Sequence, residues 1–165
     1  MTPPRDITFV LTSCGRFDLL AETLRTFVAC NTAPIARWLV VEDSGREEVR
    51  DVVRGAGVPI ELIVNDPPVG QMTSIDRAYA TVDTAYIFHC EDDWEFYQTG
   101  FIADSKSVLE HDKSIYTVWL RHPSDRNGHP VLSGVRKTIN DVRFQDMATN
   151  YRRQWHGMSW NPGLR

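Results

Sequence analysis

Three consecutive carboxylates directly follow an apolar segment in this 165-residue sequence. Glu91, Asp92 and Asp93 come after the apolar residues 86–90 and before Trp94. Neighbouring acids repel one another, so such a run is costly unless a cation or hydrogen-bond donors offset its charge. Clusters that offer only oxygen ligands suit hard cations such as Mg²⁺ and Mn²⁺, which in turn hold phosphates. The run is therefore a candidate cation site, with a solvated acidic turn as the alternative.

Two further polar clusters follow apolar segments in the same way. Residues 12–16 follow the apolar segment 7–11, and residues 42–44 follow the apolar segment 38–41. If these segments are parallel strands, their carboxyl ends share one edge of a sheet, where open α/β sheets bind their ligands. The convergence of the three clusters favours a ligand site over three unrelated turns.

The spacing of apolar residues predicts the elements that would bring these clusters together. Strands are expected at 7–11, 38–41, 60–64, 86–90 and 115–120, and helices at 20–28, from 44 to 55 or 57, at 75–82 and at 101–110. Ser44 and Glu47 are typical of a capping box at the start of the second helix. Apolar strands that alternate with amphipathic helices predict an α/β domain whose mostly parallel central sheet carries helices on both faces.

The composition fits one domain with one core. Of the residues, 42% are hydrophobic and 24% are charged. No apolar run reaches the ~20 residues that span a bilayer, and the first residues lack a signal-peptide core. The three cysteines, Cys14, Cys30 and Cys90, are odd in number and widely spaced, which argues against a disulfide framework or a zinc site. We therefore expect a cytoplasmic protein with no transmembrane segment.

The net charge of −4 is unevenly distributed. Residues 1–120 hold 10 Lys and Arg against 19 Asp and Glu, whereas residues 121–165 hold 8 against 3. The basic part is either a solvated surface or a source of cations for an anionic ligand that the acidic part binds through a metal. Nucleic acid is not expected as a partner, since the chain is acidic overall and its aromatic residues do not interleave with a basic stripe.

Several common site motifs are absent from the sequence. The first strand–helix turn has one glycine, Gly15, so the dinucleotide fingerprint is missing, and no P-loop occurs. Neither the zinc-protease motif nor the nucleophile elbow of hydrolases is present. A nucleotide whose base contacts the first two turns, and whose phosphates are held by a metal at residues 91–93, remains consistent with the sequence.

Four segments, in this order, resemble nucleotide-sugar glycosyltransferases of the GT-A fold, especially the family-2 type. Residues 7–27 are similar to the opening of these enzymes, and residues 40–44 to the acidic pair after their second strand. Residues 91–93 resemble their Asp-x-Asp motif, with glutamate in the first acidic place, and residues 159–164 a segment that often begins the acceptor side. The resemblance covers most of the chain and implies a Rossmann-like GT-A sandwich.

The resemblance implies a metal-dependent, hexosyltransferase-like glycosyltransferase. Such an enzyme moves a sugar from a nucleotide-diphosphate sugar to a saccharide or other hydroxyl acceptor, with a UDP-sugar favoured as donor and a GDP-sugar as the alternative. Asp93 would coordinate Mn²⁺ or Mg²⁺. Glu91 would be either a second ligand of the metal or an acid in its outer coordination sphere. Asp43 would accept a hydrogen bond from the base. The implied nucleotide-binding residues are Thr12, Cys14, Arg16, Glu42, Asp43 and Asp92.

The acceptor side is less clearly marked. In the resembled family the general base is a carboxylate of the acceptor half, and the acids after residue 120 are Asp125, Asp141 and Asp146. We predict Asp146 as the catalytic base. His156 is a candidate metal ligand, and the aromatic residues 151, 155 and 160 either stack on sugars or pack in a core. Residues 131–136 and 142–144 are expected to pair as short strands.

Residues 1–120 are thus expected to form the nucleotide-sugar-binding half, and residues 121–165 a partial acceptor-side segment of the same domain. Resembled enzymes usually continue beyond a segment such as 161–164, so a truncated or non-catalytic nucleotide-sugar-binding domain is one alternative. A sugar-phosphate nucleotidyltransferase is another, although it needs a glycine-rich, basic first turn that residues 12–16 scarcely supply. An oligomer is compatible with the sequence.

Overall fold

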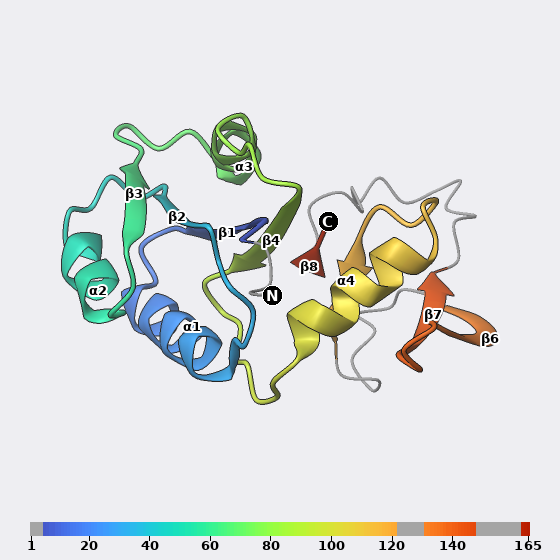
Figure 1. Cartoon of the computed structure of the whole chain (residues 1–165). Coiled ribbons are helices and arrows are strands. Elements are labelled where there is room, and N and C mark those ends of the chain that lie inside the picture. The colour runs from blue at the N-terminus through green and yellow to red at the C-terminus, as the bar shows by residue number, and fades with distance from the viewer. Residues whose placement is uncertain (1–4, 122–130, 148–162) are drawn as a thin grey trace.

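A computed structural model describes residues 5–121, 131–147 and 163–165. Within this part of the chain, a six-stranded sheet has the order β3-β2-β1-β4-β8-β5 (Figure 1). Its strands are β1 (Ile7–Ser13), β2 (Arg37–Glu42), β3 (Ile60–Val64), β4 (Tyr86–Glu91), β5 (Val118–Trp119) and β8 (Gly163–Leu164). The helices are α1 (Phe17–Cys30), α2 (Val49–Gly55), α3 (Gln71–Tyr79) and α4 (Phe101–His111). The predicted alternation of strands and helices is confirmed.

Strands β1 to β4 are parallel, as predicted. β1 pairs with β2 on one side and β4 on the other, and β2 pairs with β3. The chain therefore moves outward from β1 through β2 to β3 and then crosses back over the sheet to β4. The connection after β1 leads to β2 on one side, and the connection after β4 leads to β5 on the other side. The carboxyl ends of β1 and β4 therefore lie at a topological switch point, the usual ligand position in such sheets.

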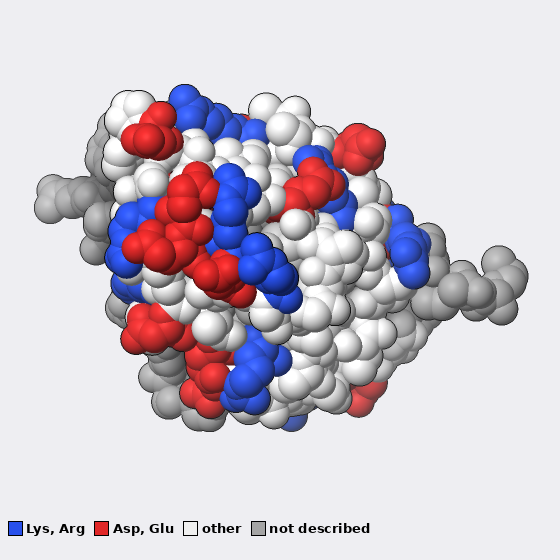
Figure 2. All heavy atoms as spheres, turned by 90° about the vertical axis from the view of Figure 1, so that its left-hand side faces the viewer, with Lys and Arg blue, Asp and Glu red and all other residues white. Residues whose placement is uncertain are grey.

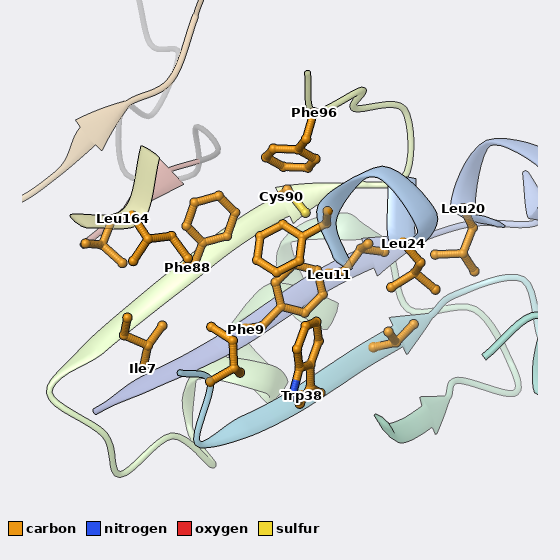
Figure 3. Close-up of a cluster of buried hydrophobic side chains, with 14 of the residues drawn as sticks. Ile7, Phe9, Leu11, Leu20, Leu24, Trp38, Phe88, Cys90, Phe96 and Leu164 are labelled. Atoms are coloured by element: carbon orange, nitrogen blue, oxygen red, sulfur yellow. The ribbon is translucent and has the colours of Figure 1, made fainter. Parts of the chain in front are cut away.

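Helices cover both faces of the sheet. One apolar cluster packs α1, α2 and α4 against side chains such as Phe9 and Leu11, whereas α3 packs on the opposite face against Val10 and Val41. The larger cluster is rich in aromatic rings, such as those of Phe9, Phe88 and Phe96 (Figure 3). The ring centroids of Phe9 and Phe27 lie 4.3 Å apart. This alternation of facing residues along β1 follows from the two-residue period of a strand.

A short strand near residue 164 separates β4 from β5. β8 is antiparallel to both neighbours, and Leu164 is fully buried between them. Gly163 has φ +148°, and a Cβ there would lie 1.9 Å from the carbonyl oxygen of Val118. Only glycine therefore fits at this position. β8 has no counterpart among the predicted strands, and β5 is shorter than the strand predicted at 115–120.

The start of α2 differs from its prediction. The helix begins at Val49 after Glu48, and no side chain caps it, so the capping box predicted from Ser44 and Glu47 is wrong. The backbone N–H of Ser44 instead donates a hydrogen bond to Oε1 of Glu42, at 2.9 Å. Residues 43–48 thus form a turn at the end of β2 rather than a helix start.

The predicted pair of strands after residue 130 is confirmed as an antiparallel hairpin. It consists of β6 (Val131–Lys137) and β7 (Arg143–Met147). The guanidinium of Arg136 joins it to the end of α4 through Asp112, at 2.6 Å, and the hydroxyl of Ser107 contacts that of Thr138 at 2.9 Å. The hairpin is therefore attached to α4.

Charged side chains of both signs lie next to one another on the side of the molecule that carries α2 (Figure 2). Arg50 with Glu47 and Arg54 with Asp51 are ion pairs of this helix and the turn before it. Among the residues that the structure describes, no helix is long and apolar enough to cross a membrane.

Candidate functional site

The acidic run lies at the end of β4 and is held by β1 and α1. The hydroxyl of Ser13 donates to Oδ2 of Asp92 at 2.9 Å, and Asp92 is only 1% exposed. From α1, the Thr23 hydroxyl contacts the carbonyl oxygens of Asp92 and Trp94, at 2.8 and 2.7 Å. β1 thus holds the side chain of Asp92, and α1 holds the backbone of the run. Glu91 is half-buried and Asp93 is exposed.

Arg16, which immediately precedes α1, bridges two acids of the run. Its Nε lies 3.3 Å from Oδ2 of Asp92, and a second guanidinium nitrogen contacts Oδ1 of the same carboxylate. The third lies 3.1 Å from Oδ2 of Asp93. Burial lowers the pKa of Arg16, but the two carboxylates, Asp92 above all, outweigh it and raise that pKa.

Glu91, the first acid of the run, is the last residue of β4 and contacts α3. Its Oε1 accepts a hydrogen bond from the side-chain amide of Gln71, at the start of α3. Burial, followed by the negative charge of Asp93, raises the pKa of Glu91. The two carboxylates are therefore close enough to repel each other, and a shared cation would relieve that repulsion.

Glu91 and Asp93 carry the two carboxylates of the run that solvent can reach, since Asp92 is buried. Within residues 5–121, 131–147 and 163–165, no group of three or more His, Cys, Asp and Glu side chains is arranged to hold a metal ion. Mg²⁺ and similar ions are commonly held by one or two carboxylates together with substrate phosphates and water. The pair therefore fits a divalent cation that binds along with a diphosphate.

Glu42 joins the turn after β1 to the turn after β2. Its Oε1 accepts the backbone N–H of Gly15 at 2.8 Å as well as that of Ser44, and the side chain is fully buried. Gly15 has φ +72°, a conformation that side chains disfavour, and a Cβ there would meet Ser44 at 3.4 Å. Glu42 thus shapes the two turns that border the predicted nucleotide pocket.

Asp43 holds the loop before α3. Its Oδ1 accepts from the side-chain amide of Asn65 and the backbone N–H of Val69, each at 2.9 Å, and its Oδ2 accepts the N–H of Gly70 at 2.7 Å. Burial raises the pKa of Asp43, but these donors together lower it below its ordinary value. The carboxylate is therefore charged and firmly oriented at the carboxyl end of β2.

Thr12 and Cys14 differ in their surroundings. The Thr12 hydroxyl is buried and lies 3.4 Å from Nε2 of His89, whose other ring nitrogen lies 2.8 Å from the hydroxyl of Tyr79. Cys14 is exposed on the turn, and burial together with the nearby Glu42 raises the pKa of its thiol. Thr12, Cys14, Arg16, Glu42, Asp43 and the acidic run are thus all brought to the same edge of the sheet.

Asp146 is not brought to this edge. Asp146 forms an ion pair with Arg136 at 3.0 Å, and the same arginine pairs with Asp112 at the end of α4. Further back in α4, Lys106 pairs at 2.8 Å with Asp6, which directly precedes β1. This part of α4 therefore lies at the amino end of β1, opposite the edge where the acidic run lies. The catalytic role of Asp146 stays a prediction, which this position does not support. Asp141 pairs with Lys137 in the hairpin.

The other acceptor-side candidates, Asp125, Tyr151, Trp155, His156 and Trp160, lie outside the described residues.

Arg121 is a basic residue at this edge that is not among the residues predicted for the site. β5 runs in the same direction as β4, because each is antiparallel to β8. Arg121 follows the end of β5, and its Cζ lies 5.8 Å from the ring of Trp94 and 6.0 Å from that of Trp119. Trp94 directly follows Asp93, so the guanidinium of Arg121 lies near the ring of the residue next to the acidic run. The place of Arg121 just after the strand predicted at 115–120 could have marked it as a site residue.

Comparison with known proteins identifies the fold. No family model and no curated protein sequence matches the chain. The mannosyltransferase PcManGT from Pyrobaculum calidifontis, solved in complex with GDP-Man and Mn²⁺, matches with a TM-score of 0.61 and 14% identity over 75% of this chain and 38% of its own. TarS of S. aureus matches with a TM-score of 0.53 and 12% identity over 63% of this chain and 19% of its own.

These similarities show that the chain has the α/β fold of glycosyltransferases. At 14% and 12% identity they establish the fold alone. The chain spans less than two fifths of the length of either structure.

Proposed function

We propose that this chain is the donor-binding part of a metal-dependent glycosyltransferase of the GT-A, family-2-like type. The observation that carries the proposal is the meeting of three polar clusters at the switch point of the sheet, after β1, β2 and β4. The firmly oriented Asp43 and the carboxylates of Glu91 and Asp93 support the roles that the resemblance implies for them. The Mn²⁺ and GDP-Man bound to a mannosyltransferase with this fold support the assignment.

Each cluster has a distinct part in the proposed site. The end of β1 at Thr12 and the turn that contains Cys14 would contact the base and ribose, together with Asp43 as a hydrogen-bond acceptor. Glu91 and Asp93 would hold Mn²⁺ or Mg²⁺, which supplies Lewis-acid stabilisation of charge on the leaving diphosphate. Because negative charge develops on that diphosphate as the sugar bond breaks, nearby guanidinium groups stabilise it further.

The acceptor side is proposed to be incomplete in the described part of the chain. The ion pair between Asp146 and Arg136 holds the predicted base away from the acidic run. This observation favours a second candidate function, a nucleotide-sugar-binding unit whose attacking groups are supplied elsewhere. In both cases the part after residue 120 is an acceptor-side extension of one domain.

Calorimetry with nucleoside diphosphates tests the donor site directly. UDP and GDP are titrated into the protein with Mn²⁺ or with a chelator, and Asp93→Ala is compared with Asp51→Ala, an exposed acid of α2. We expect Mn²⁺ to strengthen binding to the unaltered protein and to Asp51→Ala by about tenfold or more, and to have little effect on Asp93→Ala. Equal affinity with Mn²⁺ and with chelator would contradict the proposal.

Donor hydrolysis separates the two candidate functions. An active transferase site is expected to release free sugar slowly from UDP- or GDP-sugars in the presence of Mn²⁺. Nucleotide binding without any release of sugar would favour the binding unit.

A further inference from the structure

Arg16 bridges two carboxylates that differ in their access to solvent. Only 1% of the Asp92 side chain is exposed, against 43% of Asp93 and 50% of Arg16 itself. Asp92 receives two guanidinium nitrogens and the hydroxyl of Ser13, whereas the contact with Asp93 is a single one at 3.1 Å. The Asp93 contact can therefore be broken while Arg16 stays bound to Asp92.

A divalent cation on Asp93 would compete with that single contact. The guanidinium nitrogen lies on Oδ2 of Asp93, one of the two oxygens that the carboxylate can offer to a metal. Like charges so close together repel strongly, even at a partly exposed site. A cation that binds Asp93 must therefore displace this guanidinium nitrogen or bind weakly beside it.

We propose that Arg16 is the resident counter-ion of Asp93 and that it transfers to the donor diphosphate when the donor and a divalent cation bind together. This inference rests on the proposed function. A planar guanidinium has several fixed donors, so it can keep its contacts with Asp92 and turn the remaining nitrogen to a phosphate oxygen. Arg16 would then act at the diphosphate rather than in the base pocket that the resemblance implies.

The exchange makes the two binding steps depend on each other. Without a diphosphate, Arg16 competes with the cation for Asp93, so Mn²⁺ alone binds weakly. With a diphosphate, the displaced nitrogen gains a new anionic partner, so Mn²⁺ and nucleotide bind better together than either does alone. A residue that only lined the base pocket would not alter the binding of Mn²⁺ alone.

Binding of Mn²⁺, followed by the electron paramagnetic resonance signal of the free ion, tests this exchange. The titration is made with and without UDP or GDP on four proteins: the unaltered chain, Arg16→Lys, Arg16→Met/Asp92→Asn and Arg25→Lys. Lysine keeps a charge for buried Asp92 but lacks the fork that spans two carboxylates. The double variant removes Asp92's charge along with its partner, so no unpaired charge is left buried. Arg25 pairs with Glu22 on the exposed face of α1 and serves as the control.

We expect both Arg16 variants to bind Mn²⁺ alone about two- to fivefold more tightly, the range for release of one partly exposed ion pair. The same variants should lose most of the gain in Mn²⁺ affinity that the diphosphate gives to the unaltered protein. Arg25→Lys should behave like the unaltered protein in both titrations. Thermal unfolding and circular dichroism establish that the variants are folded.

Failure of the counter-ion role and failure of the proposed function would give different results. Unchanged or weaker binding of Mn²⁺ alone in both Arg16 variants would overturn the counter-ion role, even where the unaltered protein binds Mn²⁺ and nucleotide together. Failure of the unaltered protein to bind nucleotide in a Mn²⁺-dependent manner would overturn the proposed function itself.

Discussion

The hydroxyl of Ser13 donates a hydrogen bond to Oδ2 of Asp92 over 2.9 Å, and both residues are almost completely buried. The bond connects the carboxyl ends of β1 and β4 directly beneath the proposed donor site. Replacement by Ser13→Ala would leave a buried carboxylate without one of its donors. We expect the free energy of unfolding to fall by about 1.5–3 kcal/mol, as measured by urea denaturation.

Ser114→Ala is the matched control for this change. Ser114 also donates to an aspartate, Asp112, at 2.7 Å, but that bond is exposed to solvent. Water can replace the lost donor there, so a much smaller loss is expected. Equal losses in the two variants would mean that burial of the Ser13 bond has no energetic consequence.

Gly163 should not tolerate a side chain. Its backbone has φ +148°, and a Cβ would overlap the carbonyl oxygen of Val118. Gly163→Ala should therefore displace β8 from between β4 and β5 and cost about 1–3 kcal/mol from backbone strain alone. Gly134→Ala in β6 has open space around its Cβ and an ordinary φ, so its thermal midpoint should stay close to that of the unaltered protein. Similar midpoints for both variants would show that β8 is not held as described.

The sequence was informative where local patterns decide the structure. The four parallel strands and their helices were predictable, because apolar runs and helical spacing are properties of neighbouring residues. β8 was not predictable, since two residues, Gly163 and Leu164, have no period and form a strand only through partners far away in the chain. The acids of the site were likewise found from their places after strands.

Contacts within the site depended on the tertiary structure. Ser44 matched a capping box, but the Glu42 carboxylate takes its backbone N–H and the helix starts later. Arg16 was assigned to the base pocket, and its actual partners, Asp92 and Asp93, follow a strand that is distant in the sequence. A turn fixes where a side chain starts, whereas its partner depends on how strands are ordered in the sheet.

The buried His89 should make the protein less stable in mild acid. Burial, and to a lesser extent Arg165, lower the pKa of His89 to about 3 from an ordinary value of 6.5. The folded state therefore stays unprotonated between these values while the unfolded state binds a proton, so stability falls as the pH decreases from about 6.5 towards 3. At pH 5 the loss relative to pH 7 should be about 2 kcal/mol.

His89→Gln is expected to remove this part of the pH dependence, because glutamine does not titrate. Urea denaturation at pH 5 and pH 7 measures the difference for the variant and the unaltered protein. His111→Gln, at an exposed position near the end of α4, should keep the full difference. An unchanged difference in His89→Gln would show that His89 does not cause the acid sensitivity.

Arg121 should act on the diphosphate of the donor rather than on its base. It follows β5 at the edge where β1 and β4 end, and the ring of Trp94 links it to the acidic run. Arg121→Met should therefore weaken the binding of UDP or GDP in the presence of Mn²⁺ by about tenfold, as expected for loss of one hydrogen bond to a charged group. Binding of uridine or guanosine, which lack phosphates, should change little.

Lys106→Met, which removes a cation paired with Asp6 at the opposite edge, is the control in the same calorimetric titrations. If Arg121→Met weakened nucleoside and diphosphate binding equally, Arg121 would support the shape of the pocket and not the charge of the diphosphate.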